Sequence, residues 1–229
     1  MMWEPPGLGS QNQEDEVQTR SISSVLLAVG MALSACGLSN AQTDVAASLY
    51  GDFTENSTGN GTTQSPSNAA GFLLEARHIR NPVIGYEATY AFNRANQTYR
   101  STIPTSCPVG SGICLPTAVS ADAHEVTGDW VASLRIANLK PFALAGAGIL
   151  IDAPAGGQSN TNTNTNTSTS TKAVFVYGAG VDWGLLPHIG LRLQYRGNVY
   201  RAPDLTSAFS STGAFTHTAE PMIGAYFRF

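Results

Sequence analysis

The sequence predicts an all-β protein, namely an eight-stranded antiparallel transmembrane β-barrel that winds as an up-and-down meander. Eight runs of about ten residues alternate apolar and polar side chains, which is the pattern of strands whose two faces meet different surroundings. The connections between these runs are alternately short and long. Charged residues make up 12% of the chain, about half of the share in soluble domains, whereas the hydrophobic share of 42% is ordinary.

The first four predicted strands are residues 44–53, 71–80, 83–93 and 125–134. The first has Asp44 and Asp52 on its polar face, and the second alternates less regularly. The third is clean, because every second residue from Ile84 to Phe92 is apolar or aromatic. The fourth has Trp130 on its apolar face. Each run has about the length that a tilted strand needs to cross a bilayer.

The last four predicted strands are residues 141–151, 173–183, 189–200 and 220–229. The run 141–151 is apolar on both faces, so its orientation stays open; we assign Phe142 to the lipid face. In 173–183, bulky side chains such as Trp183 oppose glycines. The run 189–200 is the clearest, because Arg192 and Arg196 share a face with polar or small residues, and apolar or aromatic residues from Leu191 to Val199 occupy the other face.

The connections predict which ends of the strands lie on the same side of a membrane. Three are short, at residues 80–82, 135–140 and 184–188. Four are long, at residues 54–69, 94–123, 152–171 and 201–215. Short turns on one side and long loops on the other are typical of bacterial barrels. Both termini then fall on the short-turn side.

The alternating faces predict a charged lumen. An eight-stranded interior is just wide enough for side chains to fill it, so we place the small and charged residues inside and the bulky apolar residues against lipid. Buried charges must be paired. The predicted lumen network consists of Glu75, Arg77, Glu87, Asp129, Arg192, Arg196 and Arg228.

Two other interpretations of the same faces stay open. A soluble lipocalin-like barrel would turn the apolar face inward around a ligand. A membrane barrel with an unplugged lumen would instead be a narrow channel for small solutes.

The N-terminal residues are interpreted as two segments that precede the barrel of residues 42–229. Residues 1–21 form an extension that does not look like a leader, and the true translation start is expected near Arg20. Residues 22–41 contain an uncharged run followed by a small-x-small cleavage site at Ala41, as in a signal peptide. A transmembrane helix, or lipoprotein cleavage before Cys36, are the alternatives.

The last eight residues carry a resemblance to a known family. Gly224, Phe227 and Phe229 match the C-terminal insertion signal of small bacterial outer-membrane β-barrel proteins, whereas Met222 stands where a polar residue is usual. The chain therefore resembles OmpA/OmpX-like proteins. This implies the bacterial outer membrane with both termini periplasmic, and a structural or surface-interaction role. The implied partners are outer-membrane lipid, the barrel-insertion machinery and an unknown extracellular ligand of the loops.

Residues outside the barrel pattern suggest one disulfide and no enzyme. Cys107 and Cys114 lie close together in one loop of a compartment that permits disulfides, so we expect them to be bonded. The His-x-Ser pattern of outer-membrane lipid A deacylases fails, because His217 is followed two places later by Ala219. No motif suggests a cofactor. Residues 42–229 hold 11 basic and 12 acidic residues, so no basic stripe suggests nucleic acid.

Overall fold

The computed structural model describes residues 42–80, 83–102, 116–155 and 167–229. The chain separates into two units, Met1–Asn40 and Ala41–Phe229. The predicted extension of residues 1–21 and signal peptide of residues 22–41 lie outside the described residues. So do Cys107 and Cys114 with their predicted disulfide.

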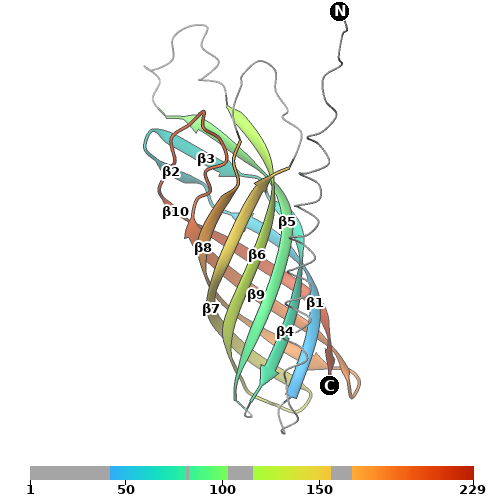
Figure 1. Cartoon of the computed structure of the whole chain (residues 1–229). Coiled ribbons are helices and arrows are strands. Elements are labelled where there is room, and N and C mark those ends of the chain that lie inside the picture. The colour runs from blue at the N-terminus through green and yellow to red at the C-terminus, as the bar shows by residue number, and fades with distance from the viewer. Residues whose placement is uncertain (1–41, 81–82, 103–115, 156–166) are drawn as a thin grey trace, which may run out of the picture. The chain divides into compact units, whose positions relative to one another are not determined.

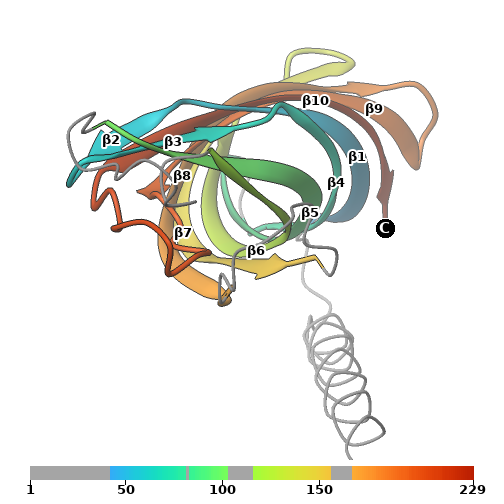
Figure 2. The ribbon, with the colours of Figure 1, turned by 90° about the horizontal axis from the view of Figure 1, so that it is seen from above.

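Eight long strands form a closed antiparallel barrel, which confirms the predicted fold class (Figure 1). They are β1 (Gln42–Thr54), β4 (Ala69–Ile79), β5 (Ile84–Ser101), β6 (Thr117–Ser133), β7 (Leu139–Pro154), β8 (Ser170–Gly184), β9 (Ile189–Arg201) and β10 (Phe215–Arg228). Each pairs with the next along the chain, and β10 returns to pair with β1, so that the sheet closes on itself (Figure 2). Among the described residues, no helix is long and apolar enough to cross a membrane.

The register of the strands sets the tilt of the barrel. Following the paired residues once around the sheet from Phe53 on β1 leads back to Thr43, ten positions earlier on the same strand. In an eight-stranded barrel, a stagger of this kind goes with strands tilted by roughly 35–45° from the axis. The tilt brings inward side chains from neighbouring strands together at one level of the lumen.

The two faces of the wall differ in the way the sequence predicts. Trp130 is 70% exposed and Leu49 68% exposed, and both point away from the lumen. Inward positions of the same strands are buried and mostly polar or charged, as with Ser48 and Asp129. This is the reverse of a lipocalin-like barrel, in which the apolar face surrounds a ligand.

Two strands extend beyond the apolar part of the wall. The outward face of β5 is apolar or aromatic up to Phe92 and then becomes polar at Arg94, Asn96, Thr98 and Arg100. Polar residues on this face mark the level at which the wall leaves the bilayer. The predicted loop 94–123 is therefore partly wrong, because β5 runs on to Ser101 and β6 already begins at Thr117.

The predicted loop 54–69 is also partly wrong, because it contains a short hairpin. Strands β2 (Ser57–Gly59) and β3 (Thr62–Pro66) pair with each other, and β3 pairs with the outer part of β5. Asn60 and Gly61 between them have positive φ of 48° and 76°, as a two-residue type I′ hairpin turn requires. The hairpin widens the sheet only at the long-loop end (Figure 1).

The segment 202–214 packs across this end of the barrel. Leu205 is completely buried and forms an apolar cluster with Tyr99, Val119 and Ala121, against which Phe209 packs. The Tyr99 hydroxyl donates to the Pro203 carbonyl at 2.9 Å and accepts from the Leu205 amide at 3.2 Å. The connection between β9 and β10 is therefore held in place by both backbone and side-chain contacts.

Candidate functional site: the charged lumen

The lumen contains many more acids than bases. Nine carboxylic acids are buried there, namely Asp44, Asp52, Glu75, Glu87, Glu125, Asp129, Asp152, Asp182 and Glu220. The buried cations are Arg77, Lys140, Arg192 and Arg196. An isolated charge at such a position is very unfavourable, so these buried side chains must interact with one another.

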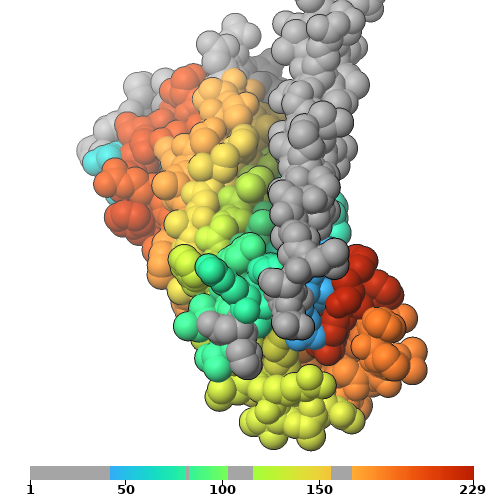
Figure 3. All heavy atoms as spheres, turned by 60° about the horizontal axis from the view of Figure 1, so that its bottom comes forward, coloured from blue at the N-terminus to red at the C-terminus, as the bar shows by residue number. Residues whose placement is uncertain are grey.

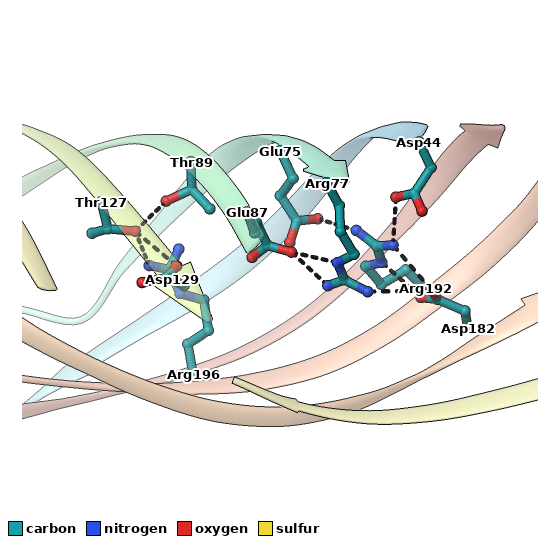
Figure 4. A network of polar contacts seen from close by, with 10 residues as sticks. All are labelled: Asp44, Glu75, Arg77, Glu87, Thr89, Thr127, Asp129, Asp182, Arg192 and Arg196. Atoms are coloured by element: carbon teal, nitrogen blue, oxygen red, sulfur yellow. Dashed lines mark hydrogen bonds and ion pairs between the residues drawn. The ribbon is translucent and has the colours of Figure 1, made fainter. Parts of the chain in front are cut away.

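Arg192 on β9 is the centre of this set (Figure 4). Its side chain is fully buried, and its Nε atom lies 2.7 Å from Asp182 Oδ1 on the neighbouring strand β8. Its two other nitrogens reach across the lumen to Asp44 Oδ1 on β1, at 2.9 Å, and Glu75 Oε2 on β4, at 3.2 Å. One guanidinium therefore joins four strands.

Arg77 on β4 forms the second half of the same cluster. It lies 2.6 Å from Glu87 Oε2 and 3.3 Å from Asp182 Oδ2, so that Asp182 bridges the two arginines. The guanidinium carbon of Arg77 also lies 4.0 Å from the centre of the Phe142 ring, a favourable cation–π arrangement.

Phe142 therefore faces the lumen, and its assignment to the lipid face is wrong. Both faces of β7 are apolar, so its sequence does not reveal which side points inward. The pairing with β8 decides it, because Phe142 stands opposite Gly180. A Cβ atom at Gly180 would lie 2.5 Å from the ring, so the glycine provides the space that Phe142 occupies.

Arg196, four residues after Arg192 on the same inward face of β9, belongs to a separate group. Its Nη2 atom lies 3.0 Å from Glu125 Oε1 and 3.3 Å from the Thr127 hydroxyl on β6. The same hydroxyl donates to Asp129 Oδ2 at 2.9 Å. The Asn198 amide donates to both Glu125 and Glu220, at 2.9 and 3.0 Å.

The predicted network members thus fall into three places. Glu75, Arg77, Glu87 and Arg192 lie in one cluster, and Arg196 lies in the neighbouring group, which Asp129 joins through Thr127. Arg228 lies at the short-turn mouth, where its guanidinium contacts the Tyr226 hydroxyl at 3.4 Å.

Sequence reasoning left several lumen residues out of the predicted network. Asp44 shares the inward face of β1 with Asp52, so alternation could have included it. Lys140 and Asp152 were assigned to connections, because the ends of β7 extend past the predicted strand. Their burial depends on strand length, which the alternation of a few residues does not fix.

The charged cluster lies between two cavities that share no lining residue. The one toward the long loops has a volume of about 30 Å³ and is lined by Asp52, Glu125, Asp152 and Glu220, among others. That is room for roughly two water molecules. The other opens at the short-turn mouth and has a volume of about 270 Å³. Among the described residues, no three His, Cys, Asp or Glu side chains are arranged to hold a metal ion.

Of the predicted insertion signal, Gly224 and Phe227 lie on the last strand, β10, and Phe229 directly follows it. Phe227 and Phe229 point outward, with ring centres 5.1 Å apart in an edge-to-face arrangement. Gly224 stands opposite Ser48 on β1, and a Cβ atom there would meet the Ser48 hydroxyl and the Ala47 carbonyl. Gly224 therefore also allows the first and last strands to approach each other.

The chain matches one protein family over most of its length. A model described as the outer membrane protein β-barrel domain matches residues 23–216. The chain belongs to this family. It is an outer membrane β-barrel protein of bacteria, and the predicted resemblance is confirmed.

Solved structures of other outer membrane proteins are similar to this barrel. OprG from Pseudomonas aeruginosa has a TM-score of 0.54 at 12% identity, and the match covers 84% of this chain and 98% of OprG. Ail of Yersinia pestis, solved with the heparin analogue sucrose octasulfate, has 18% identity, covers 83% and 100% of the two chains, and has a TM-score of 0.48. Neisserial surface protein A has 13% identity, covers 85% and 100%, and has a TM-score of 0.46.

At these identities the similarity concerns the fold of an outer membrane barrel, and no activity follows from it. The comparison with curated proteins gives no match.

Proposed function

We propose that this outer membrane barrel acts at its long-loop end, as a structural or surface-interaction protein with a closed lumen. The observation that carries the proposal is the buried cluster around Arg192 and Arg77, which joins strands on opposite sides of the lumen through Asp182 and Glu75. An ion that passed through would have to displace these contacts. We expect neither catalysis nor a bound cofactor.

The long-loop end supports the same role, because its described residues form an ordered platform. The hairpin β2–β3 continues the sheet of β5 and β6, and Asn60 Nδ2 donates to the Ser211 carbonyl at 2.8 Å. Arg94 and Arg100 lie exposed on the outward side of β5 at this end. A platform of this kind can present the long loops to an extracellular ligand.

The orientation and the assembly route belong to the same proposal. The short turns and both termini would lie in the periplasm, after removal of residues 22–41 as a signal peptide. Gly224, Phe227 and Phe229 would be read by the barrel-insertion machinery. Cys107 and Cys114 would form a disulfide in one extracellular loop.

Conductance in planar lipid bilayers tests whether the lumen is closed. The purified wild-type protein should give no steady single-channel steps, whereas Arg192→Ala and Arg196→Ala should each produce them. Arg94→Ala, which removes an arginine from the outside of the wall, is the matched control and should stay silent. Steady steps from the wild-type protein would favour the narrow channel for small solutes instead.

Binding by whole cells tests the surface role. Bacteria that express the protein should bind at least one probe on an array of glycans and extracellular-matrix proteins. A variant in which Asn60–Gly61 and the flanking hairpin are replaced by a short linker should lose this binding while it remains in the outer membrane. Equal binding by both kinds of cell would contradict a role for the platform.

A further inference from the structure

The short-turn mouth of the barrel has a basic cavity that the proposed surface role does not use. Its volume is about 270 Å³, and it lies between the turn that precedes β7, the turn that follows β8 and the end of β10. The first two of these segments lie side by side at this end of the molecule, coloured yellow-green and orange in Figure 3, and the Gly184 amide donates to the Asn138 carbonyl at 2.9 Å. Arg135, Lys140 and Arg228 all line the cavity.

These three cations have no carboxylate partner within ion-pair distance in the described part of the chain. Lys140 is 7% exposed, and its Nζ atom contacts Gln42 Oε1 at 3.4 Å. Arg228 has its guanidinium carbon 5.2 Å from the centre of the Tyr226 ring. A buried ammonium group with one weak neutral acceptor has much of its hydrogen-bonding capacity unused.

Gln42 cannot satisfy both of its cationic neighbours. In the orientation that serves Lys140, the amide nitrogen of Gln42 faces the Arg228 guanidinium, so two donors oppose each other. Turning the amide over places the oxygen toward Arg228 and removes the acceptor from Lys140. In either orientation one of the two cations lacks the Gln42 oxygen as an acceptor, and an anion would supply one.

Asp182, the acid in the lining, is already engaged. Its Oδ1 atom accepts from Arg192 Nε at 2.7 Å. Its Oδ2 atom accepts from Arg192 Nη2 at 3.0 Å and from Arg77 Nη1 at 3.3 Å. The short-turn mouth therefore has a surplus of positive charge, whereas the rest of the lumen has a surplus of acids.

An apolar rim borders the same cavity. Leu139, Leu185 and Leu186 belong to its lining and are exposed. A cationic centre beside exposed leucines suits a ligand that has an anionic head group and apolar chains. Arginine and lysine together bind phosphate oxygens through charge-assisted hydrogen bonds.

We propose that the short-turn mouth binds an anionic phosphate group, held by Lys140, Arg228 and Arg135. The phosphate can belong to a phospholipid of the adjoining leaflet, whose chains would lie along the leucine rim, or be free in solution. The site is independent of the proposed surface role, so that either can fail without the other.

The test uses the full-length protein, purified in a maltoside detergent that contains no phosphate. The probes are inorganic phosphate, followed by calorimetry, and phosphatidylglycerol, followed by native mass spectrometry. Dioleoylglycerol, which has acyl chains but no phosphate, is the control lipid. Lys140→Met and Arg228→Ala are compared with Arg80→Ala, which removes an exposed arginine from another short turn at the same end.

Lys140→Met and Arg228→Ala should each weaken phosphatidylglycerol binding about tenfold, the effect of losing one charge-assisted hydrogen bond. Arg80→Ala should leave binding unchanged, and all three variants should keep the heat-modifiable migration of a folded barrel. Binding of inorganic phosphate with the same dependence on Lys140 would identify the free ion as a ligand, and binding of phosphatidylglycerol alone would identify the lipid. The proposal is overturned if dioleoylglycerol binds as well as phosphatidylglycerol, if neither phosphate probe binds, or if Arg80→Ala weakens binding as much as Lys140→Met.

Discussion

Arg192 is completely buried, and its guanidinium lies among Asp44, Glu75 and Asp182. Taking an arginine and three acids out of water is costly, and only well-formed contacts compensate for it. The planar guanidinium suits this position, because its nitrogens can point at acceptors on several strands at once. A single side chain can therefore connect walls of the barrel that are distant in sequence.

We predict that Arg192→Ala lowers the free energy of unfolding by about 3–5 kcal/mol, because removing the cation leaves buried carboxylates without their opposite charge. Urea unfolding of the protein in lipid vesicles measures this change. Arg94→Ala is the control, since it removes an exposed arginine, and it should change the unfolding midpoint little. Similar losses for the two variants would mean that the lumen cluster does not stabilise the barrel.

The pair formed by Arg94 and Asp122 gives a prediction about pH. Both side chains lie on the outward face beyond the apolar band, and Arg94 Nη2 donates to Asp122 Oδ2 at 2.8 Å. The hydrogen bond from Arg94 lowers the pKa of Asp122 below its ordinary value of 3.8. A carboxyl with a lowered pKa stabilises the folded state above its unfolded pKa, and this contribution is lost as the pH falls through the folded pKa.

An NMR titration of the Asp122 carboxyl carbon should therefore show a midpoint below 3.8 in the wild-type protein. The midpoint should rise toward the ordinary value in Arg94→Ala. An unchanged Asp122 midpoint in the variant would contradict the assigned cause.

At the scale of elements, strands β5 and β6 show how far alternation can be read. Inside the bilayer, the contrast between an apolar and a polar face marks each strand. At the short-turn side, the predicted end of each of the eight barrel strands lies within a few residues of the observed end. Beyond Phe92 both faces of β5 are polar, so the contrast disappears although the strand continues to Ser101. The hairpin β2–β3 was missed for the same reason, although Asn60–Gly61 is a strong signal for a type I′ turn.

Gly61 gives a prediction at this scale. Its φ of 76° makes Gly61→Ala unfavourable by about 1 kcal/mol, and the strain falls on a short hairpin rather than on the barrel. Limited proteolysis of the folded protein should cut residues 57–66 several-fold faster in the variant, whereas the urea midpoint of the barrel should stay the same.

Gly128→Ala is the matched control, because a Cβ atom at Gly128 has no atom within 4 Å and its φ is not positive. It should change neither the cleavage rate nor the urea midpoint. If Gly61→Ala is cleaved no faster than this control, the turn does not determine the order of the hairpin.

At the scale of the whole molecule, stability depends on closing the sheet between β1 and β10. The closure satisfies the backbone hydrogen bonds of both strands, which lipid cannot do. It also brings Asp44 on β1 to the same level of the lumen as Arg192 on β9, so that the charged cluster forms only in the closed barrel.

Removal of residues 222–229 tests this dependence. The truncation takes away the partners of Asp44 to Tyr50 on β1, so we expect no heat-modifiable band and no protection from protease in lipid vesicles. The single change Phe229→Ala keeps every paired residue of β10 and should give a folded barrel that inserts more slowly. A truncated protein that still migrates as a folded barrel would contradict the need for closure by β10.

The sequence by itself determined the number of barrel strands, their order, the side that faces lipid in every strand except β7, and several of the charged residues in the lumen. It could do so because a membrane wall imposes a period of two that each strand expresses locally. Only the tertiary structure decided that Phe142 points inward under Arg77, that Asp182 joins two arginines, and that Arg228 lies at the mouth beside Lys140. Those contacts depend on the stagger between strands, a property of the closed sheet that no single segment encodes.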